Sequence, residues 1–160
     1  MLTEEDLRIR WRSASAFVYV GVASVVVGGL VAAATRPTGL EHGSWLAAYL
    51  VLVSGVAQIG LGAGQAWLAR TPPSRGTTGW ELLLWNGGDV AVVAGTLAAA
   101  PPAVDVGGLA LLAALVLFLA GVRRARTADG LLLVYRLLTL VVAVGIPIGL
   151  VLSGLRHGWT

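Results

Sequence analysis

Cysteine and lysine are both missing from this chain of 160 residues, and charged side chains of any kind are scarce. Without cysteine there is no disulfide framework, thiolate metal site or cysteine nucleophile. Charged residues make up 12% of the chain and hydrophobic residues 57%, whereas a soluble domain has about 25% and about 45–50%. So little charge cannot cover a water-soluble exterior, which excludes an ordinary soluble enzyme and a disordered chain.

The basic residues also indicate where the protein belongs. All 11 are arginine, and Ala, Gly, Val and Leu dominate the rest of the chain, as is typical of GC-rich bacterial genes. Most of the arginines flank apolar runs instead of forming a basic patch interleaved with aromatic residues, so the positive net charge does not indicate a nucleic-acid partner. We therefore predict a bacterial inner-membrane protein that contacts the lipid bilayer and no nucleic acid.

Apolar runs along the chain predict its architecture. A helix that crosses a bilayer needs roughly 17–25 mostly apolar residues, and five runs meet this length: 13–35, 40–69, 79–100, 103–122 and 130–155. We predict an all-α polytopic membrane protein with five transmembrane helices in a compact bundle. The whole chain, residues 1–160, then forms a single transmembrane domain.

Short motifs predict where two of these helices begin. Thr38 and Glu41 stand just before the second apolar run, and Thr78 and Glu81 stand at the start of the third. This spacing is that of a capping box, in which the threonine and the acidic side chain bind free N–H groups of the first turn. We therefore expect helices to start at these two places.

The arginines also predict an orientation, because cytoplasmic loops of membrane proteins are enriched in basic residues. With a cytoplasmic N-terminus, eight arginines lie inside and two, Arg36 and Arg156, lie outside, while Arg136 falls within the last span. The eight are Arg8, Arg10, Arg12, Arg70, Arg75, Arg123, Arg124 and Arg126. We predict a multi-pass protein of the plasma membrane with its N-terminus in the cytoplasm and its C-terminus outside.

Small residues predict how some spans pack, because they let helices approach closely in lipid. Ser24, Gly28 and Ala32 form a stripe at four-residue spacing on the first span, so we expect this face to contact a neighbouring helix. The fourth span has almost no polar side chain, and we expect it to be the most lipid-exposed of the five.

Polar residues inside the spans are the candidate site. They are Gln58 in the second span, Trp85, Asn86 and Asp89 in the third, and Arg136 and Thr139 in the fifth. Because a polar group facing lipid is costly, these side chains should face inward and form one buried cluster. We expect Asp89 and Arg136 to share it, directly or through Asn86, Gln58 or a water molecule. Two interpretations remain open: the cluster holds the helices together, or it lines a site for a ligand or for protons.

Histidines offer a different candidate site at the outer face. His42 begins the second span and His157 follows the fifth, and two imidazoles can ligate haem iron or another metal. His42 also shares a helical face with Trp45 and Tyr49, opposite the face that carries Gln58. Haem b is the cofactor that this alternative implies.

Together these features favour a small, non-enzymatic integral membrane protein, because no nucleophile–base pair, metal motif or phosphate loop is found in the sequence. We expect its intramembrane polar cluster to bind a small or amphipathic ligand or a partner helix. The haem- or metal-binding protein is the alternative. A homo-oligomer or a membrane partner subunit is compatible with either function.

Overall fold

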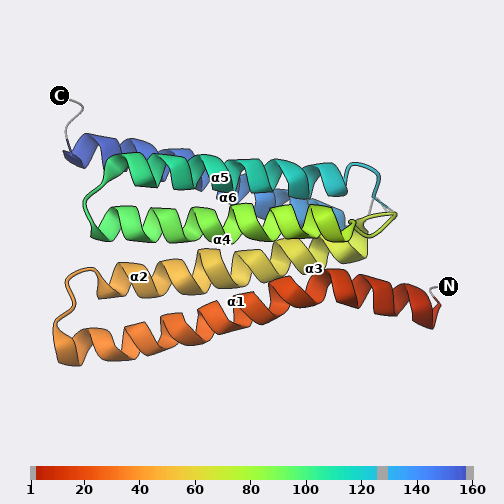
Figure 1. Cartoon of the computed structure of the whole chain (residues 1–160), viewed down its shortest axis with the longest axis horizontal. Coiled ribbons are helices and arrows are strands. Elements are labelled where there is room, and N and C mark those ends of the chain that lie inside the picture. Colours follow the sequence, from red (N-terminus) through yellow and green to blue (C-terminus); the bar gives the residue numbers. More distant parts are fainter. Residues whose placement is uncertain (1–2, 126–129, 158–160) are drawn as a thin grey trace.

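A computed structural model describes residues 3–125 and 130–157, with side chains up to residue 146, and in it the chain folds into a bundle of five helices (Figure 1). This confirms the all-helical prediction.

The first helix is α1 (Glu4–Thr38). The second is continuous but has three parts, which are α2 (Gly43–Tyr49), a π-helix η1 (Leu50–Ala57) and α3 (Gln58–Leu68). It is followed by α4 (Arg75–Leu97), α5 (Pro101–Gly121) and α6 (Gly130–His157).

Three of the helices are long and apolar enough to cross a membrane, which is consistent with a membrane protein. These are α1, the continuous helix from Gly43 to Leu68, and α5. The helix α4 carries Glu81 and Asp89 on its buried side, and these charges lower its mean hydropathy. For α6 the apolar part within the described side chains, Gly130–Ile146, is shorter.

The helices pair as two hairpins. The helix α1 packs along the second helix, α4 packs along α5, and α6 lies against α5 and α3. The start of α1, the end of α3 and the start of α4 lie at the same end of the bundle (Figure 1). The end of α5 lies there too, because the backbone N–H of Arg70 donates to the carbonyl of Arg124 at 3.3 Å.

Glycines let α4 and α5 pack backbone against backbone. A Cβ atom on Gly88 of α4 would lie 2.8 Å from the Gly107 carbonyl oxygen of α5, and one on Gly107 would lie 2.7 Å from the Gly88 carbonyl. The expectation that the fourth apolar run is the most lipid-exposed is therefore wrong. Among the three candidate spans it is α1 that has the smallest buried share.

Helix starts differ from the predicted capping boxes. Thr38 is the last residue of α1, where its hydroxyl donates to the Ala34 carbonyl at 2.6 Å, and Thr78 lies inside α4. The helix α4 begins earlier, because Ser74 accepts a hydrogen bond from the Thr77 N–H at 3.2 Å. A capping box does form at Thr3, which starts α1 well before the apolar run. The spacing alone cannot tell a helix start from a helix interior.

The small-residue stripe on α1 makes the predicted contact at Gly28, which is buried against the second helix. A Cβ atom there would lie 2.7 Å from Val51 Cγ2 and 3.0 Å from the Ala47 carbonyl oxygen. Gly28→Leu should therefore lower the free energy of unfolding by about 1–3 kcal/mol through overpacking. Gly29→Leu is the matched control, because a Cβ atom on Gly29 meets nothing within 4 Å. Equal melting temperatures for the two variants would contradict the contact.

Candidate functional site

Polar side chains from the second helix and from α4 meet where the two hairpins face each other. We call this set of six the polar seam: Tyr49, Ser54, Gln58, Gln65, Glu81 and Asp89. Gln58, Gln65 and Glu81 are fully buried, Ser54 and Asp89 are buried, and Tyr49 is half-buried. Glu81 and Asp89 lie on the buried side of α4 with Trp85 halfway between them. Four-residue spacing on a helix places the three on one face.

At one end of the seam, Asp89 bonds to the second helix. The Tyr49 hydroxyl donates to Asp89 Oδ1 at 2.8 Å. The Ser54 hydroxyl also lies beside Asp89. Among the described residues neither Ser54 Oγ nor Asp89 Oδ2 has a hydrogen-bond partner. One oxygen of this carboxyl group is therefore bonded across the hairpins, and the other lies near Ser54 without a hydrogen bond of good geometry.

At the other end, Glu81 bonds to Gln65. The Gln65 amide Nε2 donates to Glu81 Oε1 at 2.7 Å. This amide lies directly over Gly121 of α5, where a Cβ atom would collide with it. Gln65 Oε1 and Glu81 Oε2 lack partners among the described residues. The arrangement repeats that at Asp89, with one carboxyl oxygen bonded and the other unpartnered.

Between the two carboxyl groups lies a stretch with no internal hydrogen bonds. Both amide atoms of Gln58 and the Trp85 indole Nε1 are buried without a partner in the described part of the chain. Buried polar groups are nearly always hydrogen-bonded, and leaving one unpaired costs about 1–3 kcal/mol. Such a run of unpaired atoms is expected where water molecules complete the hydrogen bonding.

The seam is acidic. Eight residues separate Glu81 from Asp89, which is about 12 Å along a helix. Arg10 is the single buried basic side chain among the described residues, and it bonds the Ala66 and Ala69 carbonyl oxygens at 2.6 and 3.0 Å, at the end of α3. Neither carboxyl group has an ion-pair partner within the residues described. A positive charge is therefore what the seam lacks.

Arg136 does not join the buried cluster that it was predicted to share with Asp89, which corrects the sequence prediction. Arg136 is exposed, while its neighbours Tyr135 and Thr139 are buried. The helix α6 turns these two inward, and its register places Arg136 on the outer face. Asn86 is half-buried and Thr139 is buried, and both bond their own helices, to the Leu82 and Tyr135 carbonyls at 2.9 and 2.8 Å.

Four seam residues were not among the predicted site residues: Tyr49, Ser54, Gln65 and Glu81. The spacing of Glu81 and Asp89 was a signal for Glu81, since eight residues is close to two helical turns. Tyr49 could not be found this way, because regular α-helical winding places it opposite Gln58. The π-helix η1 lies between them and winds with i→i+5 hydrogen bonds, so the two residues reach the same side.

The described part of the chain does not form a metal site with the histidines. His42 is exposed and precedes α2 without capping it, and the side chain of His157 lies outside the described residues. Those residues contain no group of three His, Cys, Asp or Glu side chains that could hold a metal ion. Support for the haem or metal alternative therefore rests on the sequence alone.

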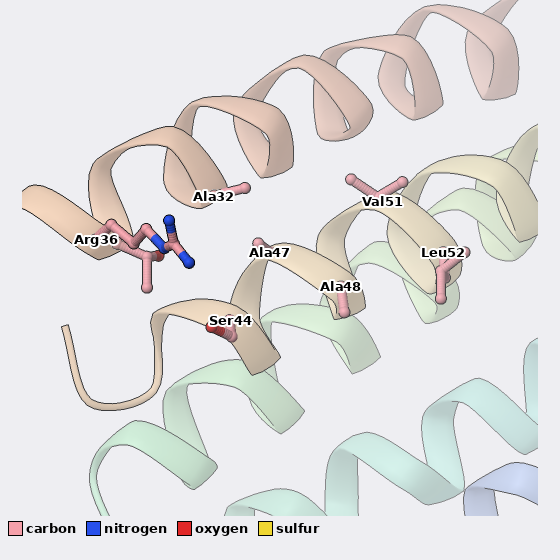
Figure 2. A pocket seen from close by; sticks show the side chains of 8 residues that line it. Ala32, Arg36, Ser44, Ala47, Ala48, Val51 and Leu52 are labelled. Carbon is pink, nitrogen blue, oxygen red and sulfur yellow. The ribbon is translucent and has the colours of Figure 1, made fainter. Parts of the chain in front are cut away.

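A second feature is a groove at the end of the bundle that holds the α1–α2 connection (Figure 2). Its volume is about 490 Å³, and it lies between the last turns of α1 and the start of the second helix. Arg36 extends across its mouth, and alanines and aliphatic side chains form its floor. It is lined by Ala32, Thr35, Arg36, Ser44, Ala47, Ala48, Val51 and Leu52.

No protein-family model matches the chain, and comparisons with curated proteins and with solved structures give no match either.

Proposed function

We propose that this chain is a non-enzymatic membrane protein with five transmembrane helices whose polar seam binds a small monovalent cation. The observation that carries the proposal is the pair of buried carboxyl groups, Glu81 and Asp89, each with one oxygen that has no partner among the described residues. An ionisable group inside a membrane is expensive, and it is retained where it pairs or serves a pathway.

The donor set favours a hard cation. The unpartnered atoms near Asp89 include Asp89 Oδ2 and Ser54 Oγ, and Gln58 Oε1 follows one turn further along the helix. Carboxylate, hydroxyl and amide oxygens are the ligands that hard cations prefer. The oxygen atoms near Asp89 include a single carboxylate, which balances a single positive charge, so we infer a monovalent ion and take Na⁺ as the probe.

The π-helix supports the same interpretation. Ser54 lies within η1, which is flanked by regular helix on both sides. Short π-helical segments occur frequently at functional sites, because they reorient side chains at a cost to the backbone. Here the winding brings Tyr49 to Asp89, and it places Ser54 beside the same carboxyl group.

The two interpretations of the polar cluster are both part of this proposal. The bonds from Tyr49 to Asp89 and from Gln65 to Glu81 hold the hairpins together. They use one oxygen of each carboxyl group and leave the other oxygen unpartnered. Interhelical adhesion therefore accounts for the bonded oxygen of each carboxyl group, and cation binding accounts for the unpartnered oxygen atoms near Asp89.

Thermal unfolding of the purified chain tests the proposal. Because a ligand that binds only the folded state raises its stability, Na⁺ should raise the melting temperature saturably relative to choline at equal ionic strength. Asp89→Asn should abolish the rise, because it removes the charge that the ion balances. Asp105→Asn, an exposed acidic residue of α5, should retain it. The same rise in all three proteins would contradict a site at Asp89.

The membrane topology is part of the proposal and makes its own prediction. The start of α1 and the end of α3 lie at one end of the bundle, and the end of α1 lies at the other (Figure 1). Arg10 bonds Arg70 at the first end and Arg36 lies in the last turn of α1, which supports a cytoplasmic N-terminus by the excess of arginine on that side. Reporter domains fused after Arg126 should report the cytoplasm, and those fused after Thr160 the outside. Both fusions reporting the same side would mean an even number of spans.

A further inference from the structure

The groove of Figure 2 has the chemistry of a lipid site. Its floor is apolar. Ala32, Ala47 and Ala48 have short side chains, so a trough remains between the two facing helices. Its volume of about 490 Å³ falls within the range of about 300–1,000 Å³ typical of small-molecule sites. From Ser44 to Leu52 the trough follows the second helix for about 12 Å.

The mouth of the groove carries one positive charge. Arg36 lies in the last turn of α1 and is exposed. Its guanidinium extends over the trough (Figure 2), and it makes no hydrogen bond or ion pair with the other described residues. A guanidinium binds phosphate oxygens through two parallel hydrogen bonds. Thr35 and Ser44 add hydroxyl groups to the lining, and the Thr35 hydroxyl donates to the Val31 carbonyl at 2.7 Å.

We propose that this groove binds one anionic phospholipid, with the phosphodiester on Arg36 and an acyl chain along Ala47, Ala48 and Val51. The position fits such an occupant, because Arg36 marks the end of a long apolar helix, where the headgroup region of a bilayer begins. A charged headgroup satisfies Arg36, and a hydrocarbon chain fills the trough. The site is separate from the polar seam and does not depend on it.

Lipid titration of the purified full-length chain in detergent tests this proposal. Native mass spectrometry would count bound phosphatidylglycerol or phosphatidylcholine with the same oleoyl chains. One phosphatidylglycerol should bind with higher affinity than phosphatidylcholine, and Arg36→Gln should weaken its binding about fivefold, as expected for one basic side chain at a membrane surface. Arg12→Gln, an exposed arginine of the same helix, should leave the affinity unchanged.

A second pair of variants tests the trough itself. Ala32→Phe should fill the trough and remove the bound lipid, whereas Ala33→Phe alters an adjacent exposed residue that does not line it. Asp89→Asn should have no effect on lipid binding, which separates this site from the seam.

Three outcomes would overturn the lipid site. Equal affinity for the two lipids would exclude recognition of the anionic headgroup. Equal weakening by Arg12→Gln and Arg36→Gln would show general surface charge, and competition by glycerol phosphate as strong as by the lipid would exclude the acyl chain.

Discussion

Replacing Arg10 with methionine should lower the free energy of unfolding by about 3 kcal/mol, the upper end for hydrogen bonds to a charged group. Arg10 is buried on α1, and its guanidinium donates to the carbonyl oxygens of Ala66 and Ala69 at 2.6 and 3.0 Å. It also donates to Arg70 at 3.4 Å. These carbonyls end α3 and have no helical N–H to bind them. Methionine keeps the apolar stem and leaves the carbonyls buried without a donor.

Two further variants make the Arg10 result specific. Arg8→Met removes an exposed arginine from the same turn of α1 and should change stability by a few tenths of a kcal/mol, as for most surface substitutions. Arg10→Lys should fall between the two, because a lysine ammonium cannot span several carbonyls as a planar guanidinium does. Equal melting temperatures for Arg8→Met and Arg10→Met would show that the hydrogen bonds from Arg10 to the end of α3 do not stabilise the fold.

Trp85→Ala should be the most destabilising single truncation, at about 3–5 kcal/mol, as for other buried aromatic residues. Trp85 is fully buried, and its ring meets Phe118 edge-on at 6.0 Å with the planes at 80°. The truncation would leave a cavity, and the residues around it would lose their van der Waals contacts with the indole ring. This loss is the same in lipid as in water, so part of the cost persists in a membrane.

The control for Trp85 lies on the same helix. Trp80 is 62% exposed, so Trp80→Ala leaves no internal cavity and should be close to neutral for the fold. Chemical unfolding of the detergent-solubilised protein, followed by far-ultraviolet circular dichroism, would measure both. A cost for Trp80→Ala as large as for Trp85→Ala would contradict the central position of Trp85.

Much of the fold could be predicted from the sequence, because composition and the length of the apolar runs determine it. Five uncharged or nearly uncharged runs gave five helices, and small residues on the first run identified Gly28 as a contact. These features depend on averages over many residues. Small local errors, such as the early start of α1 at Glu4, do not change them.

Helix rotation could not be predicted, and it decides which residues form the site. Arg136 differs from Tyr135 by one position, yet the register of α6 puts Tyr135 inside and Arg136 outside. Tyr49 reaches Asp89 because the π-helix η1 changes the winding between Tyr49 and Gln58. Nothing in a run of Leu, Val, Ser and Gly signals that change, because a π-helix depends on packing against neighbours.

The central claim is that the acidic seam holds a cation, and equilibrium dialysis with radioactive sodium tests it most directly. The purified chain should bind a single sodium ion saturably, with K⁺ competing and choline failing to compete. Asp89→Asn should abolish binding while Asp105→Asn preserves it. A wild-type chain that is folded and binds no sodium ion, or an Asp89→Asn chain that binds it as well as the wild type, would contradict the claim.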